Sequence, residues 1–191
     1  MRRLIVFNNV SLDGYFVDDH GDMSWAHNSD PEFRAFAQEN AKGGLEGGGE
    51  LLFGRKTYDL MVSYWPTTDA KQNDAITAEA MNNMRKVVFS RTMDKTSWNN
   101  TRLIKDNIAD KVRKMKQEPG STMVILGSGE IVSQLAQEGL IDEYQFVVAP
   151  IVLGKGRTMF EGVKDKLKLK LTKSRTFNNG DVLLCYEPVR D

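Results

Sequence analysis

The stretch Glu50-Leu51-Leu52-Phe53-Gly54-Arg55-Lys56-Thr57-Tyr58 determines how this chain is interpreted, because an apolar run stops at a glycine and two cations and a hydroxyl follow at once. Where a strand ends and a helix begins, backbone N–H groups and the helix dipole favour an anion, and Arg55, Lys56 and Thr57 supply further donors. An ordinary solvated strand-to-helix turn would carry the same residues. The stretch therefore predicts strand, turn and helix, with phosphate binding as one of two interpretations.

A second junction of this kind lies at residues 122–131, where the apolar run Met123 to Leu126 leads into Gly127-Ser128-Gly129-Glu130-Ile131. Glycines allow the backbone to approach a diphosphate, and the helix N-terminus that follows would point at it. The alternative is a tight turn that binds nothing, because the run lacks the full dinucleotide fingerprint. Two such turns could together clasp a diphosphate-containing cofactor.

Apolar runs and helical spacing alternate along the rest of the chain. We expect strands at residues 4–10, 51–53, 86–90, 101–104, 123–126, 144–152, 167–176 and 182–187, helices at residues 30–44, 56–61, 73–84, 108–115 and 131–140, and a long loop at residues 11–30. Strands that alternate with helices pair in parallel, whereas Asn178-Asn179-Gly180 between the last two strands is a hairpin signal. The chain is therefore predicted to be an α/β protein with a mostly parallel central sheet and a C-terminal antiparallel hairpin.

The composition limits the classes of partner and compartment. The 191 residues include 26 basic and 26 acidic ones, so no net charge favours a nucleic acid or an anionic membrane as partner. Cys185 is the single cysteine and has no internal disulfide partner, no apolar stretch reaches the roughly 20 residues of a membrane span, and no signal segment is recognisable. We expect one domain over residues 1–191, a cytoplasmic location and no metal site.

Five motifs occur in a fixed order, each at an expected strand end. They are Ser11-Leu12-Asp13-Gly14-Tyr15, Gly54-Arg55-Lys56-Thr57-Tyr58, Val88-Phe89-Ser90-Arg91, Gly127-Ser128-Gly129 and Pro150-Ile151-Val152-Leu153-Gly154-Lys155-Gly156. In these motifs the chain resembles the dihydrofolate-reductase-like family, in particular the branch typified by the C-terminal reductase domain of bifunctional riboflavin-biosynthesis proteins. The resemblance implies a three-layer α/β/α fold, NADPH as hydride donor, and a small-molecule pterin or amino-pyrimidine as substrate.

The resemblance also implies which residues hold the cofactor. Gly54, Arg55, Lys56 and Thr57 would lie on its phosphates, and Gly127, Ser128, Gly129, Glu130 and Ile131 would approach the diphosphate. Ser90 and Arg91 would meet the adenosine 2′-phosphate, and an arginine beside a hydroxyl suits such a dianion, which favours NADP over NAD. The alternative for Arg91 is a surface arginine without a ligand.

The residues implied on the substrate side are Asp13, Trp25, Asp30, Phe33, Lys155 and Arg157. Asp30 is the catalytic candidate, because a carboxylate can hold an amino-pyrimidine or pterin ring and help to protonate a ring nitrogen. Ser29-Asp30-Pro31-Glu32 equally fits a helix start with Asp30 as the cap. Asp13 fits an ordinary turn better than a ligand. Lys155 and Arg157 form a basic loop that suits either a ribose phosphate or a solvated surface.

Two departures separate the chain from dihydrofolate reductases and from the bifunctional proteins. Phe146 takes the place of the threonine that supports the substrate-binding acid, and the zinc deaminase motif His-x-Glu with Pro-Cys-x-x-Cys is missing. We expect a reductase resembling 5-amino-6-(5-phosphoribosylamino)uracil reductase, with weak or absent reduction of dihydrofolate. The alternatives are dihydrofolate reductase activity and a nucleotide-binding protein without turnover. The apolar C-terminal strands have no covering helix, which predicts a homodimer.

Overall fold

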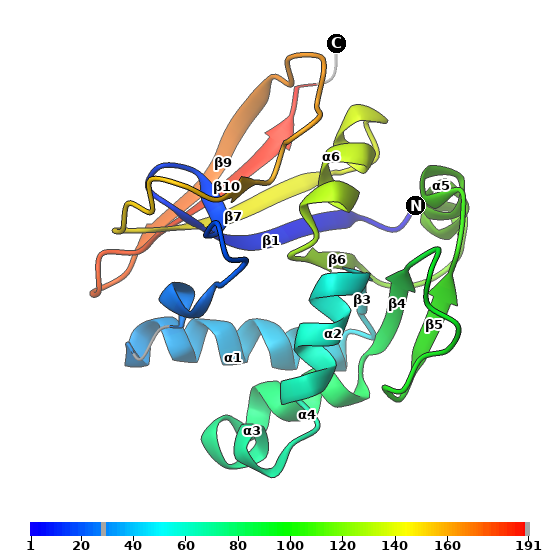
Figure 1. The fold of residues 1–191 in the computed structure, drawn as a ribbon, viewed down its shortest axis with the longest axis horizontal. Helices are drawn as coiled ribbons and strands as arrows, with labels where there is room; N and C mark the ends of the chain where they lie inside the picture. Colours follow the sequence, from blue (N-terminus) through cyan, green and yellow to red (C-terminus); the bar gives the residue numbers. More distant parts are fainter. Residues whose placement is uncertain (28–29, 190–191) are drawn as a thin grey trace.

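The computed structural model describes residues 1–27 and 30–189, and its centre is an eight-stranded sheet with the order β5-β4-β3-β6-β1-β7-β10-β9 (Figure 1). The strands are β1 (Leu4–Ser11), β3 (Glu50–Gly54), β4 (Arg85–Phe89), β5 (Thr101–Ile104), β6 (Met123–Leu126), β7 (Glu143–Ala149), β9 (Leu169–Thr176) and β10 (Val182–Pro188). The helices are α1 (Pro31–Glu46), α2 (Arg55–Tyr64), α3 (Thr68–Asn73), α4 (Ala75–Asn83), α5 (Ile108–Gln117) and α6 (Gly129–Gln137). A separate two-stranded sheet pairs β2 (Tyr15–Val17) with β8 (Arg157–Thr158).

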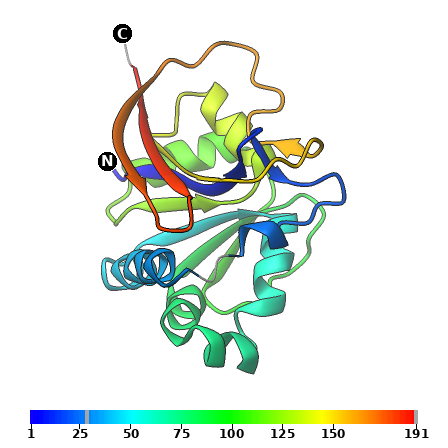
Figure 2. The same ribbon diagram turned by 90° about the vertical axis from the view of Figure 1, so that its left-hand side faces the viewer.

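The sheet is covered by helices on both faces. Helices α1 to α4 lie on one side, and α5 and α6 lie on the other (Figures 1 and 2). On the α5 and α6 side, Leu4, Val6 and Ile125 are fully buried, and on the opposite side Phe53 packs with Trp98. Burial on both faces explains why the parallel strands are continuous apolar runs in the sequence. The expected three-layer α/β/α fold is confirmed.

Six strands run parallel, and the direction reverses only in the C-terminal hairpin. β1 lies in the middle of the sheet, where Val6 pairs with Ile125 of β6 on one side and with Tyr144 of β7 on the other. β10 then pairs antiparallel with both β7 and β9. The predicted parallel centre and antiparallel end are therefore both present.

The first helix is longer than the sequence indicated. α1 runs through Gly43 and Gly44 to Glu46, and a Cβ at Gly44 would lie 3.2 Å from Met84 Cε, so this glycine allows a close approach. The left-handed residue that turns the chain is Gly48, with φ of +68°. A glycine in this sequence thus marks a close approach as well as a helix end.

Two other regions also differ from the expectation. The helix expected at residues 73–84 is α4, which the Asp74 carboxylate caps, and a short helix that was not expected, α3, precedes it at Thr68–Asn73. The long loop expected at residues 11–30 includes residues 28–29, which lie outside the described residues, and its described part contains β2 and a 3-10 turn, Ser24–Ala26. Strands as short as β2 and β8 are stabilised by each other, which no local pattern reveals.

The structure also describes the single cysteine, the apolar character of the helices and the groups of possible metal ligands. Cys185 is buried in β10, and burial raises the pKa of its thiol. None of the helices in the described part of the chain has both the length and the apolar character that crossing a bilayer requires. The same residues contain no group of three or more His, Cys, Asp or Glu side chains arranged to hold a metal ion.

Candidate functional site

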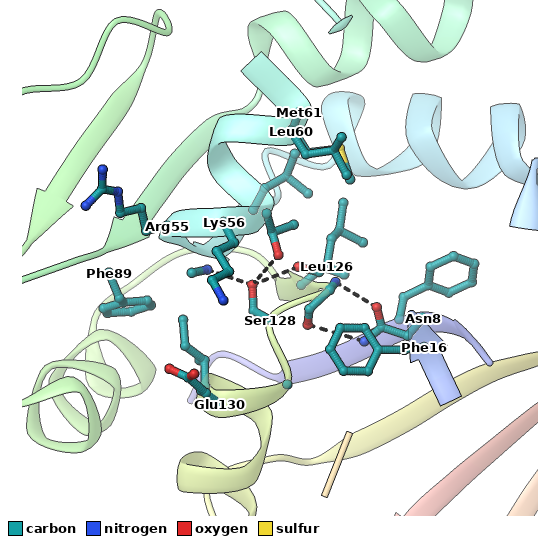
Figure 3. Close-up of a pocket in the computed structure, with 18 of the residues that line it drawn as sticks. Asn8, Phe16, Arg55, Lys56, Leu60, Met61, Phe89, Leu126, Ser128 and Glu130 are labelled. Carbon is teal, nitrogen blue, oxygen red and sulfur yellow. Dashed lines mark hydrogen bonds between the residues drawn. The ribbon is translucent and has the colours of Figure 1, made fainter. Parts of the chain in front are cut away.

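A cavity of about 1460 Å³ opens at the carboxyl ends of the parallel strands, and Figure 3 shows part of it. Its walls include the turns after β3, β4, β5 and β6, at residues 54–57, 89–92, 104–108 and 126–131. All the residues expected at a cofactor line this one cavity. Ligands of open α/β sheets bind at this edge, because loops and helix N-termini converge there.

The Ser128 hydroxyl joins the two glycine turns. The Gly54 N–H donates to Ser128 Oγ at 2.6 Å, and Ser128 Oγ lies 3.0 Å from Thr57 Oγ1. Ser128 adopts the left-handed conformation, with φ of +66°, and these contacts hold it there. Its hydroxyl therefore braces the two turns against each other.

Gly127 and Asn8 fix the second turn. Gly127 has φ of +59°, and a Cβ at this position would lie 2.8 Å from Thr57 Oγ1, so glycine alone fits. Asn8 Oδ1 accepts a hydrogen bond from the Gly127 N–H at 2.7 Å, and Asn8 Nδ2 donates to its carbonyl at 3.4 Å. Asn8 is buried at the end of β1, so it ties the central strand to the turn.

Helix capping distinguishes the helices at the cavity from the others. Helices α1, α3 and α4 have N-cap side chains that accept a hydrogen bond from the first turn: Asp30, Thr67 and Asp74. Helices α2, α5 and α6 have no such side-chain bond, and their N-cap residues all line the cavity: Gly54, Asn107 and Ser128. Three helix ends therefore present first-turn N–H groups and partial positive charge to the same space.

Two cations at the cavity are uncompensated. Lys56 and Arg91 line it, and neither makes an ion pair with any residue that the structure describes. Figure 3 shows Lys56 reaching from α2 toward the cavity, whereas Arg55 points away from it. Positive charge without a partner at uncapped helix ends favours an anionic ligand with more than one phosphate.

Arg55 is held by its own neighbours. Its Nη1 donates to Thr92 Oγ1 at 2.5 Å, and its Nε lies 3.6 Å from Asp59 Oδ2. These contacts link the first turn of α2 to the turn after β4. Arg55 therefore connects two walls of the cavity.

The remaining cofactor candidates have varied surroundings. Ser90 Oγ accepts from the Met93 N–H at 3.1 Å and closes the turn after β4. Gly129 is buried against Phe16, since a Cβ there would lie 3.0 Å from the Phe16 ring. Ile131 is also buried and belongs to the core beneath the turn. These three residues shape the wall from behind.

Of the residues expected on the substrate side, Arg157 alone lines the cavity. Its Nη2 lies 3.4 Å from Glu130 Oε1 at the start of α6, so it lies beside the turn after β6. Lys155, two residues earlier, is exposed and outside the cavity. Of the two cations of this loop, Arg157 therefore lies at the cavity and Lys155 lies in solvent.

Asp30 and Phe33 also lie outside the cavity. Asp30 Oδ1 accepts from the Phe33 N–H at 2.9 Å, so the helix-cap interpretation is confirmed. Phe33 is buried and packs edge-on against Phe177 under the C-terminal hairpin. The expectation that Phe33 contacts substrate is corrected, because its ring fills the core between α1 and β10.

Asp13 and Trp25 do not line the cavity either. Asp13 accepts from the Ser11 hydroxyl at 2.6 Å and from the Leu153 and Gly154 N–H groups at 3.1 and 2.7 Å. The Ser11 hydroxyl bond is the main reason that the pKa of the Asp13 carboxyl is lowered. Asp13 therefore clamps the loop after β7 to the turn after β1, as the turn interpretation expected.

The placement of Phe146 beside the substrate-binding acid is wrong. Phe146 packs against Phe160 in the core on the α5 and α6 side, whereas α1 covers the other face of the sheet. Successive residues of a strand point to opposite faces. Gln145 and Val147 are therefore the residues that β7 presents toward α1, and Gln145 lines the cavity.

Sequence reasoning missed several wall residues, among them Asn8, Phe16 and Gln145. The available signal was the polar pair Asn8-Asn9 at the end of an otherwise apolar strand. A carboxamide pair at the carboxyl end of a buried strand is an unusual place for polar groups unless they have partners. Nothing local in the sequence pointed to Gln145 or Phe16.

Comparisons with solved structures agree with this architecture. A putative riboflavin biosynthesis protein from Shewanella sp. PV-4 superimposes with a TM-score of 0.72 at 24% identity, over 98% of this chain and 99% of that one. The Thermotoga maritima diaminohydroxyphosphoribosylaminopyrimidine deaminase/5-amino-6-(5-phosphoribosylamino)uracil reductase gives a TM-score of 0.67 at 14% identity, over 98% of this chain and 57% of that one. Enterococcus faecalis dihydrofolate reductase, solved with NADP(H), gives 0.63 at 12% identity, over 97% and 96%. These likenesses show the fold.

Sequence comparisons identify the family. The Bacillus subtilis (strain 168) uncharacterized protein YyaP is 31% identical over 186 residues, which cover 97% of this chain and 94% of YyaP. The model of the RibD C-terminal domain matches residues 2–183. The chain therefore belongs to the RibD C-terminal domain family.

Proposed function

We propose that this protein is an NADPH-dependent oxidoreductase that reduces a small heterocyclic substrate. Membership of the RibD C-terminal domain family supports a reductase, and the observation that carries the cofactor proposal is the meeting of three uncapped helix N-termini in one cavity. NADP carries a diphosphate and a 2′-phosphate, so it matches several separate anion sites. The cavity volume of about 1460 Å³ leaves room for a ring beside a dinucleotide.

The chain's own residues have defined parts in this proposal. The first turns of α2 and α6 would hold the diphosphate, with Lys56 as the charged partner, and Gly127 would allow the close approach. Arg91 would pair with the 2′-phosphate at the turn that Ser90 closes. NADPH, when bound, supplies a hydride to an electrophilic ring carbon, and with a proton from water the products are the dihydro compound and NADP⁺.

The substrate proposed is an amino-pyrimidine or related heterocycle. The name of the Thermotoga maritima relative describes a reductase of a phosphoribosylamino-uracil, and dihydrofolate is the substrate in the name of the Enterococcus relative. A nucleotide-binding protein without turnover is the second candidate. It is favoured by one observation: the acid expected to serve catalysis, Asp30, caps α1 and does not line the cavity.

Cofactor choice tests the proposal. NADPH should bind more tightly than NADH in a fluorescence titration, and Arg91→Ala should remove about 10- to 100-fold of NADPH affinity, because a charged hydrogen bond contributes ~1.5–3 kcal/mol. NADH affinity should change little. Lys95→Ala is the matched control, since Lys95 is an exposed cation on the same connection and lies outside the cavity. Equal affinity of the unmodified protein for the two cofactors would defeat the 2′-phosphate assignment.

Turnover separates the two candidate functions. Oxidation of NADPH in the presence of a panel of pyrimidines and pterins would support the reductase. Tight binding of NADPH without oxidation by any member of the panel would favour the protein without turnover.

A further inference from the structure

The cavity extends beyond the cofactor turns into an α1-side region, which lies between the sheet and helices α1, α2 and α4. It is lined by side chains such as Ile5 and Val124 of the sheet, Ala41 of α1, Leu60 of α2 and Met81 of α4. These side chains are apolar. The region therefore offers a ligand burial of flat hydrocarbon surface.

The charged residues of the cavity lining come from a limited set of segments. They lie on residues 18–20, on the first turn of α2, on the turns after β4 and β5, on the first turn of α6 and on β8. Across the ranges 1–27 and 30–189, neither α1, α4 nor any strand of the main sheet contributes a charged side chain to the lining. The side chains that α1, α4 and the main sheet contribute to the α1-side region therefore supply no counter-charge for an anion or a cation.

The polar groups of the α1-side region are neutral. They are Asn9, Asn40, Thr77 and Gln145. Thr77 Oγ1 is buried and has no hydrogen-bond partner among the described residues, and a buried hydroxyl in that state indicates a missing partner. Gln145 Nε2 donates to Glu143 Oε1 at 2.6 Å, which orients its carboxamide.

Physical chemistry then selects the ligand. Moving a phosphate or carboxylate into an apolar region without a counter-charge loses its hydration and gains no ion pair, which is strongly unfavourable. A neutral ring instead buries its faces, and its N–H and C=O groups can satisfy carboxamides and a hydroxyl. We propose that the α1-side region binds an uncharged, flat heterocycle that carries neither a phosphate nor a carboxylate.

This inference rests on the proposed function, because it assigns the turns after β3, β4 and β6 to the cofactor. It narrows the substrate class, since a phosphoribosylated pyrimidine or a folate with its glutamate tail would bring an anion to a region where α1, α4 and the main sheet supply no cation to receive it. Asn9, Thr77 and Gln145 are the side chains that would recognise the ring.

A pair of fluorescent probes tests the charge selection. 6-Methylpterin and pterin-6-carboxylate differ at one ring position, and their dissociation constants are measured by fluorescence with and without saturating NADP⁺. The neutral probe should bind at least about tenfold more tightly to the unmodified protein. Equal or tighter binding of the carboxylate would overturn the proposal, and so would absence of binding by both probes to a protein that binds NADPH.

Substitutions that add a positive charge to α1 provide a second test of the charge selection. Asn40→Lys places a cation on an exposed position of α1 that lines the cavity. It should reduce the ratio of the dissociation constants of the carboxylate and the neutral probe about tenfold. Ala35→Lys adds the same charge to an exposed position of α1 outside the cavity and should leave the ratio unchanged. Equal effects of the two variants would contradict a local origin of the selection. Failure of the NADPH titration would defeat the proposed function alone, since the probe ratio is also measured without cofactor.

Discussion

Gly127→Ala should destabilise the protein through two separable effects. The first is backbone strain, because alanine at φ of +59° costs about 1–2 kcal/mol. The second is a clash, because the new Cβ would lie 2.8 Å from Thr57 Oγ1 and 2.9 Å from Thr57 Cγ2, and overpacking of this kind costs about 1–3 kcal/mol. The expected loss in the free energy of unfolding is therefore about 2–5 kcal/mol.

Two further variants separate these effects. Gly139 has nearly the same φ, +63°, with no atom within 4 Å of an added Cβ, so Gly139→Ala measures the strain alone. Thr57→Ala removes the two clashing atoms and leaves Thr57 Cβ at 3.4 Å, an ordinary contact. In a Thr57→Ala background, Gly127→Ala should therefore cost no more than Gly139→Ala does in the unmodified protein.

Urea unfolding followed by circular dichroism measures all of these differences. The reasoning is refuted if Gly127→Ala and Gly139→Ala cost the same, or if the excess for Gly127→Ala persists after Thr57 is truncated. The affinity for NADPH provides a second measurement, and it should fall with Gly127→Ala and stay unchanged with Gly139→Ala.

Three other predictions concern a buried lysine, the cap of α1 and assembly. Burial lowers the pKa of Lys86 from 10.5 to about 8, so between these pH values the unfolded chain binds more protons than the folded protein does. The free energy of unfolding of the unmodified protein should therefore rise with pH in this range by up to about 3 kcal/mol relative to that of Lys86→Met. Parallel curves of unfolding free energy against pH for the two proteins, measured in urea, would contradict this. Asp30→Ala should cost about 1 kcal/mol in urea unfolding and leave NADPH affinity unchanged, while more than a tenfold loss of kcat would show that Asp30 is catalytic after all. Light scattering at micromolar concentration should give a homodimer, and a mass of 21.6 kDa would disprove it.

The arrangement of strands was predictable because the signals were local. Met123 to Leu126 is an apolar run that ends at Gly127, and Asn178-Asn179-Gly180 is a hairpin turn, so neighbouring residues carry the information in both places. The extension of α1 past Gly44 could not be foreseen in this way. Gly44 lies against Met84, forty residues later, and such a distant contact leaves no local signal in the sequence.

In the candidate site, too, only the part with local sequence signals was predictable. The meeting of the two glycine turns at one cavity was predictable because Gly54 ends β3 and Gly127 follows β6, and the carboxyl ends of parallel strands share one edge. The substrate side was not, because it depends on which face of the sheet a residue occupies. One position along β7 separates Phe146, in the core under α6, from Gln145 at the cavity.

The central position of β1 has a consequence for how the protein is made. β1 leaves the ribosome before the other strands of this sheet, and its neighbours β6 and β7 end only at Leu126 and Ala149. At 5–20 residues per second, the apolar strand waits on the order of 10 s for both partners to emerge. During synthesis its unpaired edges are therefore open to wrong partners, and a slower ribosome or a missing chaperone would lower the yield of active protein without any change in its final stability.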